Sequence, residues 1–196
     1  MYLMTCTRPD LAYPLSLLAR YVAPRRHRKV HWDAAKRVLC YLCNMSGIGL
    51  VLGGRGPIVL TGHADASWVD DSATQQSSQG SGSVSWRSTC SPSVLSSSCE
   101  VEIYAGAMAT QELRWLTYQL TDLGEQTRSP PVLLEHIALR YFLARELQQR
   151  GQLRLAYVAT RANTADIFTK ALPLGDHQRF STVSGLVYTL PHLLTA

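Results

Sequence analysis

Residues 100–123 form the longest periodic segment of the sequence and constrain the fold more than any other. Four leucines recur there at the spacing of one helix face, namely Leu113, Leu116, Leu120 and Leu123. Gly124 follows at the position where a helix is commonly capped. The pattern therefore predicts one long amphipathic helix that has an apolar face.

The remaining segments alternate between strand and helix patterns. Strands are predicted at residues 57–65, 84–87, 94–97, 130–134 and 153–158. Further helices are predicted at residues 8–22, 30–44, 137–149, 163–171 and 176–184. The Ser/Gln-rich stretch 70–83 is predicted to be a loop. Strands mixed with helices along one chain place the fold in the α/β or α+β class.

A glycine-rich stretch, Gly47 to Gly56, interrupts the chain and predicts a domain boundary near residue 50. We therefore expect a helical arm over residues 1–50, a main domain over 51–182 and a tail over 183–196. A chain of 196 residues is long enough for one domain plus such an arm.

Membrane and secreted classes receive no support from the sequence. No apolar run reaches the length needed to cross a bilayer, and the N-terminal residues lack the pattern of a secretory signal. The five cysteines are an odd number, which argues against a disulfide framework. We expect an intracellular protein without a membrane partner.

The net charge of +5 is unevenly distributed along the chain. Residues 51–135 carry 9 acids against 4 Lys and Arg, whereas both flanking regions are basic. This distribution suits a metal site beside a surface that binds a polyanion, although ordinary variation in charge explains it equally well. Six basic side chains lie close together with only Asp33 opposing them: Arg25, Arg26, Arg28, Lys29, Lys36 and Arg37. We expect this group to contact nucleic-acid phosphates.

Three acidic residues occupy unusual positions. Asp65 ends an apolar strand, Glu102 stands near the start of the long helix, and Asp166 lies between a strand and a short helix. Carboxylates at such places hold hard divalent cations through oxygen ligands. The alternative is that Glu102 favours the helix dipole and the aspartates cap turns. Spacing alone favours that alternative.

Longer motifs favour the interpretation of the three acids as metal ligands. The segments TRPDLAYPLSLLARY and HWDAAKRVLCYL resemble the end of the reverse transcriptase of copia-type LTR retrotransposons. HADASW, SSSCEVEIYAGAMATQELRWL and LRLAYVATRANTADIFTKAL are similar, in order and spacing, to the ribonuclease H domain of that family. Together they cover nearly the whole chain.

The resemblance implies a ribonuclease H-like mixed sheet with flanking helices, preceded by the helical tail of the reverse transcriptase. It also implies that acids bind two Mg²⁺ ions and that the RNA strand of an RNA–DNA hybrid, not a small molecule, is hydrolysed. Carried onto this sequence, the catalytic and metal-binding residues are Asp65, Glu102 and Asp166.

The sequence departs from the family in two places. The family's third acid belongs to an Asp-Asn motif on the strand after the long helix, but no aspartate lies between Asp122 and Asp166 here. Glu135 is the nearest acid, and we expect it at the entry to a helix. A second junction, at residues 80–83, lacks the aromatic-rich strand of the family. We therefore expect an incomplete sheet that has lost half of an antiparallel hairpin.

These departures define the expected function. We expect a degenerate fragment of a retrotransposon Pol polyprotein that has lost ribonuclease activity but keeps affinity for RNA–DNA hybrids or other nucleic acid. One alternative is an active metal-dependent ribonuclease in which Glu135 or water replaces the lost ligand. Another is a non-catalytic interaction module that only retains the fold.

Overall fold

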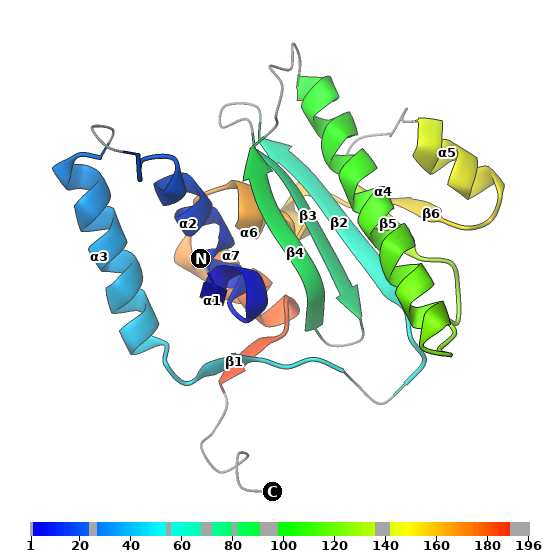
Figure 1. Ribbon diagram of the computed structural model, residues 1–196, viewed down its shortest axis with the longest axis horizontal. Coiled ribbons are helices and arrows are strands. Elements are labelled where there is room, and N and C mark those ends of the chain that lie inside the picture. Colours follow the sequence, from blue (N-terminus) through cyan, green and yellow to red (C-terminus); the bar gives the residue numbers. More distant parts are fainter. Residues whose placement is uncertain are drawn as a thin grey trace, which may run out of the picture.

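A five-stranded mixed sheet forms the centre of the computed structural model (Figure 1). The structure describes residues 2–23, 27–53, 56–67, 72–79, 82–90, 98–135 and 142–188. The strands lie in the order β4-β3-β2-β5-β6. They are β2 (Leu60–Ser67), β3 (Ser72–Gln79), β4 (Gly82–Cys90), β5 (Val132–Glu135) and β6 (Arg154–Tyr157). The three strands β2, β3 and β4 are antiparallel, whereas β5 runs parallel to both β2 and β6.

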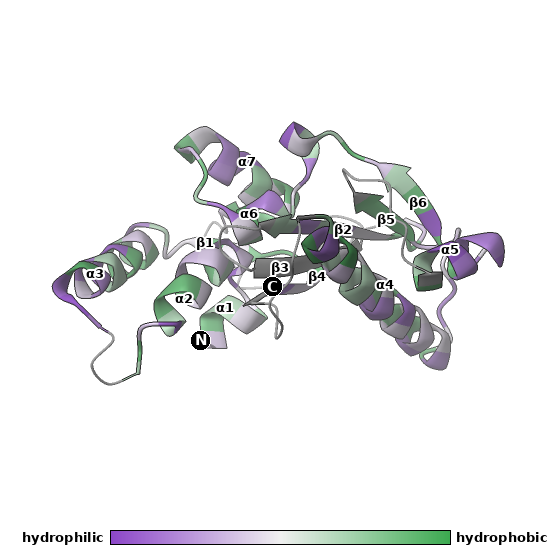
Figure 2. Ribbon diagram, turned by 90° about the horizontal axis from the view of Figure 1, so that it is seen from above, coloured by the Kyte–Doolittle hydropathy of each residue, from purple (hydrophilic) through white to green (hydrophobic). Residues whose placement is uncertain are grey.

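Two helices pack on opposite faces of this sheet (Figure 2). Successive residues of a strand point to opposite faces, so β2 presents Leu60 and Ala64 to one side and Asp65 to the other. The long helix α4 (Ser98–Asp122) covers the first side, where Leu60 and Ala64 share a buried cluster with its Leu113. The short helix α6 (Asp166–Thr169) lies on the second side, where it contacts Asp65. The acid on β2 is thereby buried under α6.

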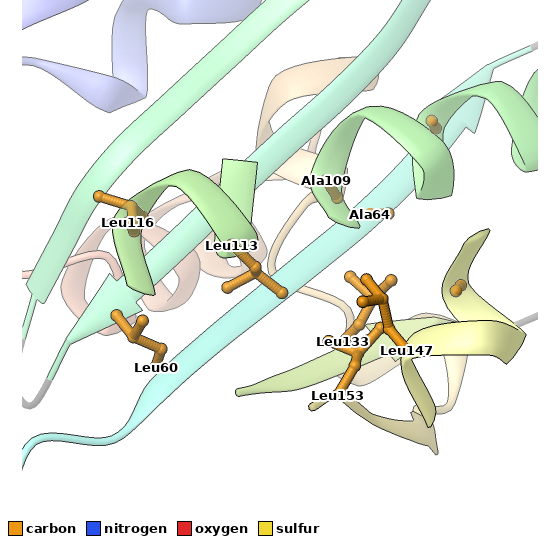
Figure 3. Packing of buried hydrophobic residues seen from close by; sticks show 10 residues of the cluster. Leu60, Ala64, Ala109, Leu113, Leu116, Leu133, Leu147 and Leu153 are labelled. Atoms are coloured by element: carbon orange, nitrogen blue, oxygen red, sulfur yellow. The ribbon is translucent and has the colours of Figure 1, made fainter. Parts of the chain in front are cut away.

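The main hydrophobic core lies between α4 and the sheet (Figure 3). Helix α5 (Phe142–Gln149) closes it beside β5 and β6. The buried residues of this core are Leu60, Ala64, Ala105, Ala109, Leu113, Leu116, Leu133, Ala144, Leu147 and Leu153. A Cβ atom on Gly62 would lie 2.8 Å from Leu113 Cδ1, so the missing side chain lets α4 approach β2 closely.

The N-terminal residues share a second core with the C-terminal helices. They form α1 (Tyr2–Cys6), the 3₁₀ helix η1 (Pro9–Leu11), α2 (Ala12–Ala19) and α3 (Lys29–Asn44). The second core joins them to α6 and α7 (Leu174–Val183) through Met4, Leu11, Ala12, Ala165, Ile167, Phe168 and Phe180. In addition, β1 (Ile48–Leu50) pairs antiparallel with β7 (Leu186–Tyr188). The boundaries expected at residues 50 and 182 remain predictions.

The mixed α/β class is confirmed, together with the helices expected at 30–44 and 100–123. Two local predictions are wrong. Residues 72–79 form β3 instead of a loop, and β3 pairs with both β2 and β4, so the hairpin is not halved. The physical reason is that strand pairing joins backbone groups, which Ser and Gln supply as well as apolar residues do. The strand expected at 94–97 lies outside the described residues.

None of the helices in the described ranges combines the length and the apolar character that crossing a membrane requires.

Candidate functional site: an acid cluster and a basic helix

Asp65 is the most deeply buried of the three acids and stands near the end of β2, with 0% of its surface exposed. On the α6 side, the hydroxyl of Thr169 donates a hydrogen bond of 2.5 Å to Asp65 Oδ2. A buried carboxylate is stable only when it is paired and hydrogen-bonded. The segment after β6, which carries Thr169, supplies such a partner to Asp65.

Lys170, the residue after α6, supplies the positive charge. Its Nζ lies 3.2 Å from Asp65 Oδ2 and 3.1 Å from Asp166 Oδ1. Burial lowers the pKa of the Lys170 ammonium, but the two aspartates outweigh that effect and raise it. One ammonium group thus bridges the first and the last acid of the cluster.

Asn163 fixes the segment that carries Asp166 against β2. Its Nδ2 donates to the backbone oxygen of Ala64 at 2.8 Å, and its Oδ1 accepts from the backbone N–H of Ala165 at 3.3 Å. The side chain is completely buried. Because Ala64 directly precedes Asp65, these two bonds set the position of α6 relative to the acid on β2.

Glu102 belongs to the same electrostatic cluster. Burial first and then the negative charges of Asp65 and Asp166 raise the pKa of its carboxyl group, while Lys170 opposes the shift, and the net value is about 8. Burial and Asp65 also raise the pKa of Asp166. The fold therefore brings Asp65 close enough to Glu102 and Asp166 to raise the pKa of both, although the three residues come from elements that are far apart in the sequence.

The resemblance implies divalent cations at this cluster. Its carboxylate oxygens are the kind of ligand that Mg²⁺ prefers. Within the described residues, however, no three His, Cys, Asp or Glu side chains gather as a metal site requires. The Lys170 ammonium instead lies between two of the acids. In this geometry the residues do not fit a divalent cation, and Mg²⁺ binding remains a prediction.

Glu135 does not stand where the sequence places it. It is the last residue of β5 and pairs with Tyr157 of β6, so it belongs to a strand and not to the entry of a helix. The prediction was wrong because the apolar run before Glu135 gives no signal of where the strand ends. The absence of an aspartate from residues 123–165 is unchanged by this correction.

The described members of the basic group lie on α3 and at Arg28 just before it, and α3 lies at the edge of the molecule in Figure 1. Arg28, Lys29, Lys36 and Arg37 are exposed, and no residue of α3 is fully buried. Lys36 pairs with Asp33 at 2.8 Å. Trp32, 66% exposed, precedes Lys36 by one helical turn, so an aromatic ring accompanies the charges. Arg25 and Arg26 lie outside the described residues.

Sequence reasoning missed three residues of the acid cluster: Asn163, Thr169 and Lys170. All three belong to the segment NTADIFTKAL, which carries Asp166. The sequence could have indicated the pair between Lys170 and Asp166, because residues one helical turn apart lie on the same helix face. The hydrogen bond across 104 positions between Thr169 and Asp65 had no such signal.

The raised pKa of Glu102 predicts how stability changes with pH. The folded-state pKa of about 8 lies above the ordinary 4.5, so folding favours the protonated carboxyl. The free energy of unfolding should therefore fall as the pH rises from about 4.5 through about 8, and then level off. Glu102→Gln, which stays neutral, should flatten this fall and be the more stable protein at high pH. Urea denaturation from about pH 5 to about pH 9 measures this.

Glu125→Gln is the matched control, because Glu125 is exposed just after α4. It should leave the pH profile as in the unmodified chain. An identical profile for Glu102→Gln would show that Glu102 is not protonated at neutral pH.

Comparison with curated proteins finds relatives among transposon polyproteins. The Pol polyprotein from transposon RE2 of Arabidopsis thaliana is 32% identical over 210 residues, which include 94% of this chain. That from transposon TNT 1-94 of Nicotiana tabacum is 32% identical over 197 residues and 88% of this chain. Secreted RxLR effector protein 161 of Plasmopara viticola is 41% identical over 60% of this chain and 85% of its own length.

The chain spans only about one seventh of the polyproteins that it matches, since the alignments cover 14% and 15% of their lengths. No family model and no solved structure matches the chain.

Proposed function

Because this chain belongs to the family of copia-type retrotransposon Pol polyproteins, we propose that it is a ribonuclease H-like segment that binds RNA–DNA hybrids without cleaving them. The observation that carries the proposal is the acid cluster on β2, α4 and α6, in which the Lys170 ammonium lies within 3.2 Å of Asp65 and 3.1 Å of Asp166. The cluster keeps three family acids but does not leave them open to a metal ion.

The order of elements supports the ribonuclease H-like assignment. The resemblance implies a first acid on a strand, a second on the long helix, a strand after that helix and a last acid before a short helix. Asp65 lies on β2, Glu102 on α4, and Asp166 begins α6. The strand after α4 is β5, which lies parallel and directly beside β2.

Two observations support the loss of cleavage. The alignment with the RE2 polyprotein covers 210 residues, whereas 94% of 196 residues is about 184, so about 26 positions have no counterpart in this chain. This deficit agrees with an internal gap in which the Asp-Asn motif is lost. Second, the Lys170 ammonium pairs with both buried aspartates, so it competes with a metal ion for their oxygens.

Binding is assigned to α3, which carries the exposed side chains of Lys29, Lys36 and Arg37. Basic side chains on one exposed helix pair with the phosphates of a nucleic-acid backbone. Such contacts release counterions, so affinity depends on salt. A hybrid would be read through its shape and backbone rather than its sequence.

The test is hybrid binding by a triple variant with Lys29→Ala, Lys36→Ala and Arg37→Ala. We expect weaker binding, and a salt slope smaller by about 2 to 3, because each lost phosphate contact removes about 0.7 to 0.9 from the slope. Fluorescence anisotropy of a labelled hybrid at several salt concentrations measures both. The control replaces three exposed arginines elsewhere, Arg145, Arg154 and Arg161. Equal losses in both variants would remove α3 as the contact.

A second candidate function is an active ribonuclease in which Glu135 supplies the lost ligand. It is favoured by the position of Glu135 on a strand beside β2 and β6. The hybrid-cleavage assay described in the Discussion separates the two. If the chain neither binds nor cleaves hybrids, a non-catalytic interaction module is left.

A further inference from the structure

A pocket of about 350 Å³ lies away from the acid cluster, between the second half of α4, residues 127–131 and the end of α5. Its floor is apolar, because Leu147 and Leu153 are 6% and 2% exposed. The volume falls within the range of small-ligand pockets, which combine an apolar lining with a few convergent polar groups. It admits a small molecule or one nucleotide of a strand, but not a duplex.

The two charged residues that line the pocket are both positive. Arg114 and Arg128 line it, and none of its lining residues, all of them described, is acidic. Arg114 is held in place: its Nε donates to the hydroxyl of Tyr118 at 2.9 Å, and its guanidinium lies 5.4 Å from the centre of that ring. Two guanidinium groups at one pocket favour a doubly charged anion such as a phosphate, which they bind through paired hydrogen bonds.

One hydroxyl group of the wall suits a different part of the ligand. Thr110 donates its hydrogen to the backbone oxygen of Gly106, and Thr117 donates to that of Leu113. Thr110 is 0% exposed and is therefore closed to a ligand. Thr117 is half-buried, and its oxygen can only accept a hydrogen bond, which suits an N–H or O–H group of a base or a sugar. The exposed ring of Tyr118 adds a face on which a base can stack.

From these features we infer that the pocket binds a nucleoside monophosphate unit, with its phosphate on Arg114 and Arg128 and its nucleoside over Tyr118 and the apolar floor. The inference goes beyond the proposed function, because the pocket uses neither α3 nor the acid cluster. The unit has two sources, a free nucleotide or the phosphorylated end of a strand. Both present the same chemistry.

The test is calorimetric titration of the full chain with uridine monophosphate, uridine and inorganic phosphate. Uridine monophosphate should bind most tightly. Arg114→Ala and Arg128→Ala should each weaken it by a factor of about 10 to 100, the usual range for a hydrogen bond to a charged group. Both side chains are exposed, so the variants should fold, which circular dichroism verifies. Arg145→Ala, an exposed arginine of α5 outside the pocket, is the control and should bind normally.

A trinucleotide with and without a 5′-phosphate separates the two sources. Tighter binding of the phosphorylated trinucleotide than of uridine monophosphate identifies a strand end, and the reverse order identifies a free nucleotide. Equal affinity for uridine and its monophosphate, or full affinity in Arg128→Ala, would overturn the inference. The α3 triple variant should bind uridine monophosphate normally, so this result is independent of the hybrid-binding test.

Discussion

The purified chain should leave the RNA strand of an RNA–DNA hybrid intact, both in Mg²⁺ and in Mn²⁺. Two-metal hydrolysis needs both ions held about 4 Å apart, so that attacking and leaving oxygens are stabilised together. Lys170 instead lies between Asp65 and Asp166, and no aspartate lies in the sequence between β5 and Asp166. A misplacement of about 1 Å already costs about a hundredfold in rate. The loss of a ligand together with an ammonium in the cluster should therefore reduce cleavage to background.

The assay follows a labelled hybrid with the unmodified chain and with Asp65→Asn. Cleavage that Asp65→Asn abolishes would refute the proposal and favour the second candidate.

A gain-of-function variant tests whether the missing Asp-Asn motif accounts for the loss of cleavage. His63 of β2 pairs with Leu134 of β5, so an Asp-Asn pair inserted after Glu135 places an aspartate two positions beyond Leu134. In an extended strand that position lies beside Asp65, two positions beyond His63. Cleavage by this variant would show that the missing motif is the main deficit.

Asp10→Ala should cost about 3 to 5 kcal/mol of unfolding free energy, the usual effect of removing one partner from a buried ion pair. Asp10 is 1% exposed, and its two oxygens accept hydrogen bonds from Arg8 Nη2 at 2.7 Å and Arg8 Nε at 2.9 Å. The hydroxyl of Tyr41 also donates to Asp10, at 2.8 Å. This network joins η1 to α3, so its loss leaves a buried guanidinium uncompensated and loosens the helix.

Urea denaturation measures the effect, and Asp33→Ala is the matched control. Asp33 makes an exposed pair with Lys36, which is worth about 1 kcal/mol or less. Domains of this size are stable by only about 5 to 15 kcal/mol, so Asp10→Ala should also lower the yield of soluble protein. If both variants lose the same small amount, the buried network does not hold the arm in place.

Local sequence patterns determined much of the fold. The helices expected at 30–44 and 100–123 formed because their periodicity is a property of neighbouring residues. Leu113 and Leu116 are buried as the leucine pattern predicts, whereas Leu123 is 77% exposed, because it lies beyond the last turn of α4. The motifs also identified the three acids of the cluster before any geometry was known.

Only the tertiary structure decided which groups contact these acids. Polar residues 72–79 became a strand because β2 and β4 on either side complete their backbone hydrogen bonds. Glu135 proved to be a strand residue because β6 pairs with it. Lys170 took the position between Asp65 and Asp166 because α6 packs on β2. Periodicity and motifs reflect interactions between residues a few positions apart. The contact between Lys170 and Asp65 joins positions about a hundred residues apart, so only the folded chain brings these two side chains together.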